Sequence, residues 1–203
     1  KVGEQWLVRQ QGAYLPKVYE VVVALIQGIT LTDKNAIHLK ALSDFKDVYK
    51  VKRVAGDEWL ITNKEAQQHI VDVYEELVKV ENAITLSSRQ YCIIMNPKDK
   101  KTNLNKWGSK VLVKGETTFF LQPGELLQTG IQTIYVLAED EALLLTAIEE
   151  FTDDTKTKRI TGEKWLIYGP MDYIPQVEVE VKETRKSIPL DENEGIYVQN
   201  ERT

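Results

Sequence analysis

The sequence predicts an all-β protein, built as a tandem array of small antiparallel β-sheet repeat domains of about 53 residues each. Two observations support this prediction. Glycines recur at nearly equal spacing, at Gly3, Gly56, Gly108 and Gly162. Between them, short apolar runs and alternating apolar and charged residues are bounded by Gly and Pro turns, which is the pattern of half-buried strands.

The stretch Ile160–Val181 shows one repeat most clearly. Gly162 can adopt a positive φ and turn the chain, and the run that begins at Trp165 is rich in β-favouring side chains. After Pro175, valines and charged residues alternate over Val177–Lys182. This period of two predicts a strand with one buried and one charged face.

The same sequence features recur upstream at fixed shifts. Trp6 aligns with Trp165 when the sequence is shifted by 159, and a shift of 106 aligns residues 31–53 with residues 137–159 without a gap. The positions that the copies share, which we interpret as the structural signature of the repeat, are Gly3, Trp6, Leu7, Tyr14, Pro16, Gly56, Trp59, Leu60, Gly108, Gly115, Gly162, Trp165, Leu166, Tyr173 and Pro175.

A further copy lies between these two, where a shift of 54 aligns residues 108–115 with residues 162–169 and puts Val111 in the place of the tryptophan. We expect the recurring tryptophans to lie in cores or at module junctions. Trp107 is out of phase with them, so it is the better candidate for an exposed contact.

The shifts divide the chain into five parts: the C-terminal part of a repeat at 1–25, complete repeats at 26–79, 80–131 and 132–184, and the start of another at 185–203. A domain of this size buries only about 60% of its unfolded surface, so each repeat should depend on its neighbours. Because no low-complexity linker separates the repeats, we expect them to abut.

Two segments also fit a helix. The first is Lys64–Val80, but its counterparts carry Pro16 and Pro175, and an interior proline costs a helix about 3 kcal/mol. We therefore expect strands there, including one at Val73–Glu75. We also expect a strand within Glu139–Phe151, although no proline excludes a helical turn in that segment.

In the repeat at 80–131, we expect a strand over Tyr91–Met95, an exposed hairpin tip over Asn96–Lys106 and a tight turn at Gln122–Gly124. The lysines of the tip form a local basic patch. We favour a solvated tip over an RNA contact, because no exposed aromatic side chain is interleaved with these lysines. The candidate contact residues are Trp107, Lys98, Lys100 and Lys101.

Composition restricts the class of protein. The 203 residues are 42% hydrophobic and 28% charged, as in ordinary folded proteins, and the net charge of −5 argues against a nucleic-acid-binding surface along the whole chain. The single Cys92 excludes a disulfide framework, and its apolar neighbours predict a buried, inert thiol. The longest apolar run, Val21–Ile26, is too short to span a bilayer.

Residue types suited to catalysis or metal binding do not form a recognisable motif. His38 and His69 have no Cys or His partner at zinc spacing, so we expect ordinary strand histidines. Asp191–Gly195 differs from a calcium loop because its glycine is the fifth residue, not the sixth, and Arg202 stands where a closing Glu would be. We expect no enzyme activity, no catalytic, metal or cofactor-binding residues and no cofactor.

Several longer motifs occur in order along the whole chain. They are Gly-Glu-x-Trp-Leu at 3–7 and 162–166, Gly-Asp-Glu-Trp-Leu at 56–60, Gly-Ala-Tyr-Leu-Pro at 12–16, Gly-Pro-x-x-Tyr-Ile-Pro at 169–175, Phe-Phe-Leu-Gln-Pro-Gly-Glu at 119–125 and Ile-Pro-Leu-Asp-Glu-Asn-Glu-Gly-Ile-Tyr-Val at 188–198. Together they resemble the major vault protein family, whose members form the shell of the vault ribonucleoprotein particle.

This resemblance implies small antiparallel β domains strung into the staves of a barrel-shaped shell. It implies self-association of the full-length protein into a large cyclic homo-oligomer, docking of vault poly(ADP-ribose) polymerase, and a location in the cytoplasm and also the nucleus. The chain departs from the family pattern in two places. Val71 replaces a proline, and Val21–Val23 is more apolar than an acidic-flanked strand, which offers additional lateral contact.

Two functions from different classes fit this reading. The first is a structural shell protein whose repeats pack side by side with those of identical chains, with alternating charges such as Glu178–Glu183 setting the register. The alternative is a protein-docking adaptor array that forms no shell. In either case we expect no direct nucleic-acid binding and no membrane insertion. The isolated chain should be mainly monomeric, because it has no apolar heptad to drive assembly.

Overall fold

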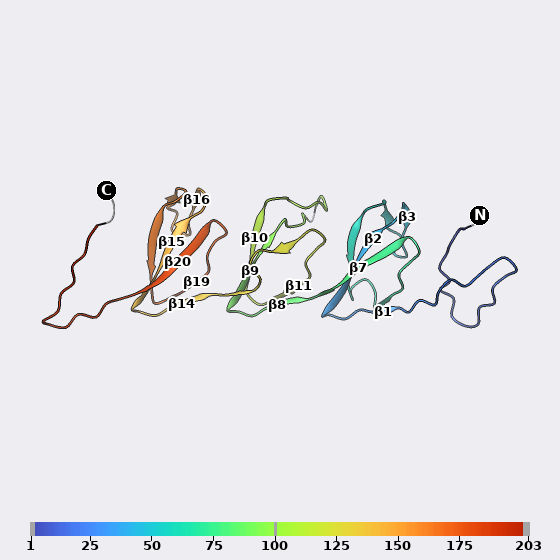
Figure 1. Ribbon diagram of the computed structural model, residues 1–203, viewed down its shortest axis with the longest axis horizontal. Helices are drawn as coiled ribbons and strands as arrows, with labels where there is room; N and C mark the ends of the chain where they lie inside the picture. The colour runs from blue at the N-terminus through green and yellow to red at the C-terminus, as the bar shows by residue number, and fades with distance from the viewer. Residues whose placement is uncertain (1–2, 100, 201–203) are drawn as a thin grey trace.

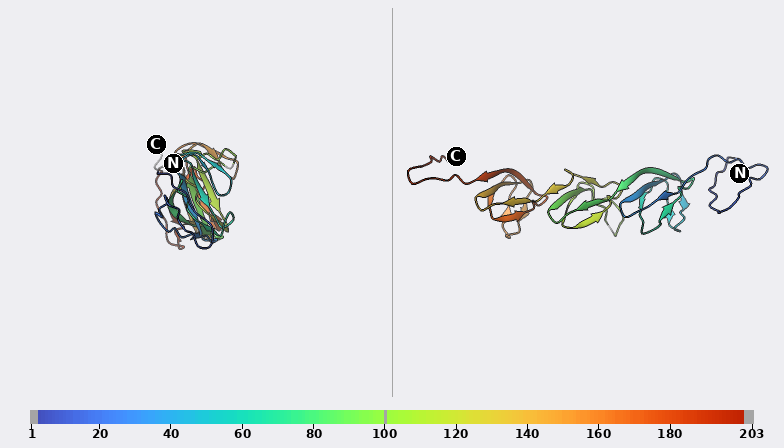
Figure 2. Two further views of the ribbon diagram at one scale, coloured as in Figure 1. Left: turned by 90° about the vertical axis from the view of Figure 1, so that its right-hand side faces the viewer. Right: turned by 90° about the horizontal axis from the view of Figure 1, so that it is seen from below.

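A computed structural model of the chain describes residues 3–99 and 101–200 (Figure 1). These residues form no helix, and hence none that could cross a membrane. Their strands form small antiparallel sheets in three successive modules, residues 29–82, 84–133 and 135–186. Seen end-on, the modules lie behind one another, and from below they form an elongated array (Figure 2). The predicted all-β tandem fold is confirmed.

The first module has seven strands around one central strand. They are β1 (Ile29–Thr30), β2 (Asn35–Ala41), β3 (Phe45–Lys46), β4 (Lys52–Arg53), β5 (Glu58–Ile61), β6 (Gln68–His69) and β7 (Glu75–Asn82). The main sheet has the order β5-β2-β7, while β1 pairs with β6, and β3 with β4 forms a hairpin at the tip. Both β5 and β7 are antiparallel to β2, so they run in the same direction at opposite edges.

The third module repeats this topology. Its strands are β14 (Tyr135–Leu137), β15 (Glu141–Ala147), β16 (Phe151–Thr152), β17 (Lys158–Arg159), β18 (Lys164–Tyr168), β19 (Met171–Tyr173) and β20 (Val179–Lys186). The main sheet has the order β18-β15-β20. Even the register irregularity recurs: it falls between His38 and Leu39 in β2 and between the aligned Leu144 and Leu145 in β15.

The second module differs at its edge and tip. Its strands are β8 (Ile84–Leu86), β9 (Gln90–Met95), β10 (Lys110–Lys114), β11 (Thr117–Phe119), β12 (Leu126–Leu127) and β13 (Gln132–Thr133). The central β9 pairs with β10 on one side and with the two short strands β12 and β13 on the other. Val111 faces Ile94 across β10 and β9, as Trp59 faces Leu39, which confirms the alignment that puts Val111 in the tryptophan position.

Each module has its own apolar core on the central strand. Two central-strand side chains, spaced two residues apart, enter each core, and the corresponding pairs are Ile37 and Leu39, Cys92 and Ile94, and Leu143 and Leu145. Separate clusters of buried residues form around each pair. Cys92 is a free, fully buried thiol, as predicted, and burial raises its pKa.

The segments that also fitted helices are strands or turns. Lys64–Val80 contains β6 and most of β7, and Glu139–Phe151 contains β15, so neither segment is a helix. The strand predicted at Val73–Glu75 begins only at Glu75, because the Glu75 amide donates to the Asp72 carbonyl at 3.0 Å and closes a turn. The predicted turn at Gln122–Gly124 is confirmed by the Glu125 amide, which donates to the Gln122 carbonyl at 2.9 Å.

The described end segments, 3–28 and 187–200, contain no strand (Figure 1). Trp6 is 56% exposed, which differs from the core position that its phase predicts. Trp59, in contrast, is covered where it pairs with Leu39 across β5 and β2. The N-terminal segment is attached to the first module through Arg9, whose guanidinium donates to the Asp72 carboxylate at 3.0 Å.

Replacing Trp59 with alanine should destabilise the first module by about 3–5 kcal/mol, as loss of a buried aromatic side chain does. Trp107→Ala should cost much less, because Trp107 is 74% exposed whereas Trp59 is 6% exposed. Chemical denaturation of the two variants measures both changes. Equal shifts of the unfolding midpoint would contradict the assignment of Trp59 to the core.

Candidate functional site

No group of three or more His, Cys, Asp and Glu side chains that could hold a metal ion occurs among residues 3–99 and 101–200. The candidate functional site is therefore a set of surfaces: the module junctions, the hairpin tips and the sheet edges. Each is built by the repeat in a regular way, and the differences between repeats indicate what each surface can do.

Single residues join the modules. β7 ends at Asn82 and β8 begins at Ile84, and the intervening Ala83 amide donates to the Lys34 carbonyl at 2.8 Å. The equivalent bonds run from Ile134 to Arg89 at 3.0 Å and from Ser187 to Asp140 at 2.8 Å. The last strand of each module is therefore held at the turn before its own central strand, and the next module starts from a fixed direction.

Tyrosine side chains pack at the junction of the second and third modules. Tyr135 and Tyr173 face each other across β14 and β19. Burial, followed by the nearby Asp154 and Asp153 carboxylates, raises the pKa of Tyr173 to about 12. Burial also raises the pKa of Tyr91, with a smaller effect from Tyr135 of the next module. Tyr91 is 6% exposed, and Tyr135 and Tyr173 pack partly buried against the core of the third module, so little of this contact faces water.

The hairpin tip of the first module rests on a buried carboxylate. The Asp47 side chain, fully buried, accepts from the Val51 amide at 2.8 Å and from Arg53 Nε at 2.9 Å. The Arg53 guanidinium in turn lies 4.2 Å from the centroid of the Trp59 ring. The Asp47 carboxylate thus closes the hairpin tip and also positions the Arg53 guanidinium over the ring of Trp59 in the core.

The third module has the same device at the aligned positions. Arg159 Nε donates to Asp153 at 3.0 Å, and the Arg159 guanidinium lies 4.6 Å from the centroid of the Trp165 ring. A hydrogen bond from the Thr155 hydroxyl, with further donors from the Thr157 amide and Arg159, lowers the pKa of Asp153 to about 2. The Asp153 carboxylate is therefore ionised at neutral pH, and the Asp-Arg-Trp arrangement stabilises the hairpin tip.

The described residues of the second-module tip, which leave out residue 100, show a different arrangement. Asn105 Nδ2 donates to the carbonyls of Asn96 and Pro123, both at 3.0 Å, and Glu125 accepts from the Lys98 amide at 2.7 Å. These bonds tie the tip to the Gln122–Gly124 turn instead of to the core.

Trp107, in this tip, is exposed and directly follows Lys106. The exposure of Trp107 agrees with the sequence prediction, and this side chain borders the lysine cluster at its end. Of the other candidate contact residues, Lys98 is half-buried and Lys101 is exposed, while Lys100 lies outside the described residues. Trp107 and the Gln122–Leu126 turn also line a groove that faces His38, Lys79 and Glu81 of the first module.

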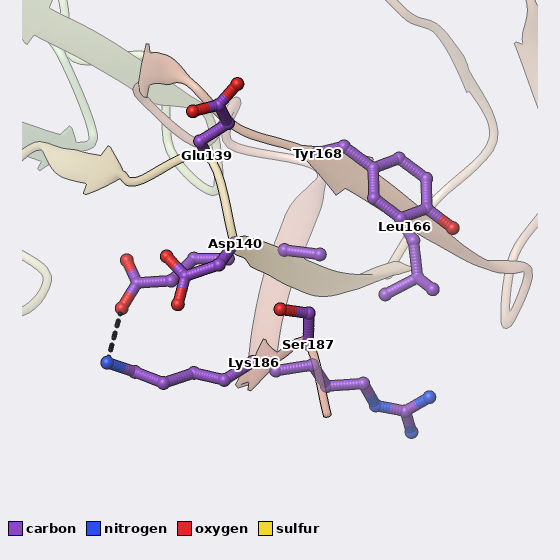
Figure 3. A pocket seen from close by; sticks show the side chains of 9 residues that line it. Glu139, Asp140, Leu166, Tyr168, Lys186 and Ser187 are labelled. Atoms are coloured by element: carbon purple, nitrogen blue, oxygen red, sulfur yellow. Dashed lines mark ion pairs between the residues drawn. The ribbon is translucent and has the colours of Figure 1, made fainter. Parts of the chain in front are cut away.

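A hollow lies on the end face of the third module (Figure 3). It is lined by Glu139, Asp140, Glu141, Ala142, Leu166, Tyr168, Arg185, Lys186 and Ser187. Lys186 Nζ pairs with Glu141 at 2.9 Å, and this contact is the main reason why the pKa of Glu141 is lowered. The corresponding face of the second module carries Tyr91, which is buried at the junction with the module that follows.

A buried polar cluster distinguishes the first module. His69 Nε2 lies 2.9 Å from Glu75 Oε2, His69 Nδ1 lies 3.0 Å from Tyr49 Oη, and the Asp72 amide donates to Glu75 at 3.0 Å. The His69 and Glu75 side chains are both 1% exposed, so no substrate can reach them. We interpret the cluster as a device that holds the β6–β7 segment in register.

The sequence alone did not reveal this cluster. The signal present was an insertion of two residues relative to the other copies, together with Val71 in place of proline. His38 is also buried: its Nε2 lies 3.0 Å from Glu58 Oε2, while its Nδ1 has no hydrogen-bond partner. His69 is closed off from solvent, and His38, which borders the groove beside Trp107, is bonded to Glu58 and not to a Ser or Cys side chain of the kind that nucleophilic catalysis requires.

The signature residues fall into three groups. The glycines all have positive φ values between 79° and 90°, which residues with a side chain rarely adopt; they are Gly3, Gly56, Gly108, Gly115 and Gly162. The residues that lie in the cores or partly buried beside them are Trp59, Leu60, Trp165, Leu166, Tyr173 and Pro175. Those in the N-terminal segment lie outside any core; they are Trp6, Leu7, Tyr14 and Pro16.

In the first and third modules one edge of the main sheet is a single continuous strand, β7 or β20, and this edge strand carries charged side chains. On β7, Lys79 pairs with Glu81 at 2.5 Å. On β20, Lys182 pairs with Glu180 at 2.7 Å, and Arg185 pairs with Glu183 at 2.6 Å. Charged side chains of this kind protect exposed strand edges from pairing with other chains.

Substitutions of His69 and Glu75 test whether this buried pair stabilises the first module. Glu75→Val should destabilise the first module by about 3–5 kcal/mol, because His69 loses its buried partner. His69→Tyr combined with Glu75→Val installs the residues at the equivalent third-module positions, Tyr173 and Val179, and should cost less than the sum of the single changes. A double-mutant cycle in urea measures this coupling. Strictly additive losses would show that the pair is not coupled.

Comparison with protein families and relatives follows the same division into modules. A family model described as the major vault protein repeat domain matches residues 29–70 and 135–176, and a second model with the same description matches residues 83–131. The two models thus separate the second module from the other two, as its divided edge and different tip do.

Relatives match over essentially the whole chain. Major vault protein beta of Dictyostelium discoideum is 53% identical over 206 residues, covering 100% of this chain and 24% of the relative. Major vault protein of Mus musculus is 48% identical over 204 residues, and that of Strongylocentrotus purpuratus is 49% identical over 205 residues. Each of these two alignments covers 99% of this chain and 24% of the relative. The chain therefore spans about a quarter of the length of the curated relatives it matches.

Proposed function

The chain belongs to the major vault protein family, and on this basis we propose that it is a segment of the wall of a vault ribonucleoprotein shell. In this role the modules are structural: copies of the chain lie side by side, and the edges of their sheets meet. The full-length protein would form a large cyclic homo-oligomer through such heterologous contacts. We retain the division into repeats at 1–25, 26–79, 80–131, 132–184 and 185–203 as part of this proposal.

The observation that carries the proposal is the array of open sheets. Each main sheet has a central strand that is paired on both sides, so its outer strands are edges. The one-residue junctions hold the modules in line, and the edges are therefore presented along the rod (Figure 1). A row of edges on a stiff rod is suited to contact with a parallel neighbour along its length.

The alternative is an adaptor array that docks partner proteins and forms no shell. The exposed Trp107 and the lysines at 98, 100 and 101 support a docking role for the second module, because exposed tryptophans are common at interfaces. We include vault poly(ADP-ribose) polymerase as a docking partner, on the strength of the family resemblance, and the cytoplasm and nucleus as locations. We propose no catalytic activity and no direct nucleic-acid or membrane binding.

Raising the local concentration of the chain distinguishes the wall from the adaptor. A terminally histidine-tagged chain bound to a nickel-chelating lipid monolayer should form parallel, side-by-side arrays in electron micrographs, because tethering supplies the effective concentration that a ring would supply. Isolated rods at every surface density would contradict the wall proposal and favour the adaptor.

In dilute solution the chain should be mainly monomeric at micromolar concentration. The contacts between narrow modules bury little area, and each chain carries a net charge of −5. Sedimentation equilibrium measures the mass independently of the elongated shape, which would make a column peak misleading. A stable dimer or larger species at micromolar concentration would show that the repeats alone carry the assembly energy.

A further inference from the structure

The hairpin tips of the first and third modules share one backbone arrangement but differ in surface. They align without a gap at a shift of 106, from Phe45–Val54 to Phe151–Ile160. In each tip an aspartate amide donates to the carbonyl four residues later, at 2.9 Å from Asp47 and at 3.0 Å from Asp153. The strands β3 and β16 of the two tips lie on the same side of the array (Figure 1). The fold of the hairpin therefore does not require the residues that differ.

The first tip exposes apolar side chains where the third tip is polar. Val48 is 50% exposed and Val51 is 44% exposed. The aligned residues are Asp154 and Thr157, and the Asp154 carboxylate accepts from Gln176 Nε2 at 2.7 Å. Two valines at the end of one hairpin leave apolar area in water that a partner could bury.

Two lysines face each other across the first tip. Lys46 pairs with Lys52 across β3 and β4, whereas the aligned pair in the third tip is Thr152 and Lys158. Like charges directly opposite each other on paired strands are destabilising. Lys158 forms an ion pair with Glu150. Neither Lys46 nor Lys52 forms an ion pair within residues 3–99 and 101–200, so their repulsion is unrelieved in the isolated chain.

The acids of the first tip do not pair with these lysines. Asp47 is buried inside the hairpin, and Asp44 and Asp57 accept from backbone amides at its base, at 2.9 Å and 2.8 Å. Residues 45–54 contain four basic residues and one acid, a net charge of +3. Residues 151–160 contain three basic residues and two acids, a net charge of +1. The surface of the first tip is therefore basic as well as apolar.

We propose that the tip of the first module, residues 45–54, docks an acidic segment of a partner protein. A carboxylate placed between Lys46 and Lys52 would accept from both and relieve their repulsion. Apolar side chains beside that carboxylate would cover Val48 and Val51. The β3–β4 hairpin is separate from the main sheet, whose edges form the proposed wall contact, so docking at the tip is independent of the wall.

Other anionic partners fit this tip less well. Its aromatic residues are Phe45, which packs against the core, and Tyr49, which stacks on His69, so neither ring is free to stack on a nucleic acid base. Two valines offer little apolar area to a lipid surface. A parallel copy of this chain would bring an identical, positively charged tip alongside.

A short synthetic peptide that alternates glutamate with valine probes this chemistry. Carbodiimide, which joins a carboxylate to a neighbouring amine, should couple the peptide to Lys46, Lys50 or Lys52, as mapped by mass spectrometry. A peptide with glutamine in place of glutamate should bind about tenfold or more weakly in fluorescence anisotropy, because it lacks the charge. Coupling at Lys98 and Lys101 instead, or equal binding of both peptides, would overturn the proposal.

Exchange of the two surfaces provides the matched variant. Lys46→Thr with Val48→Asp and Val51→Thr gives the first tip the residues of the third. It should weaken binding of the glutamate peptide by about tenfold or more, because charged and apolar contacts are both lost. Chemical denaturation should show no loss of stability, because the same hairpin carries these residues in the third module. Unchanged peptide binding in this variant would overturn the proposal.

The converse exchange should create a second site. Thr152→Lys with Asp154→Val and Thr157→Val gives the third tip the surface of the first, and carbodiimide should then also couple the peptide within residues 151–160. No coupling there would show that this surface is insufficient and overturn the proposal.

Two controls separate the tip from the wall and from other partners. The exchanged first-tip variant should still form arrays on nickel-chelating lipid, and loss of the arrays would assign the tip to contacts between copies. Phosphatidylserine vesicles or single-stranded RNA that bind the wild type more tightly than the peptide does, and not the variant, would assign it to lipid or nucleic acid. Either result would overturn docking of a protein segment. A wild type that binds the peptide but forms no arrays would overturn the wall alone.

Discussion

The one-residue junction is the constraint on which the rest of the structure depends. Because the last strand of a module continues into the next with a single intervening residue, each module inherits its direction from the one before it. The backbone hydrogen bond at Ala83, Ile134 or Ser187 then fixes the point where the strand leaves the sheet. A longer linker would leave each edge free to rotate, and no continuous surface could form along the array.

Given rigid junctions, the tips and edges are where the modules can differ without loss of the fold. The cores hardly vary, since Ile37, Cys92 and Leu143 occupy one position and are all fully buried. The tips vary more: the first and third modules bury an Asp-Arg pair against a tryptophan, whereas the second relies on Asn105 and Glu125. In the second module Trp107 lies at the surface and not against the core.

Much of the fold could be predicted from the sequence because it repeats. Glycine spacing and apolar alternation located the central strands, and the proline at one copy decided against a helix in another. What depends on pairing across the sheet could not be predicted. The register irregularity in β2 and β15, the division of the third strand into β12 and β13, and the exposure of Trp6 all depend on partners distant in sequence.

The buried His69–Glu75 pair shows why local pattern also failed at the candidate site. Local pattern reads His69 and Glu75 as surface positions, and only the structure shows that the two side chains satisfy each other out of water. The two residues inserted in this copy lie between β5 and β6, and a directional, hydrogen-bonded pair tolerates fewer registers than an apolar contact does. Specificity of register thus resides in a polar cluster within one core.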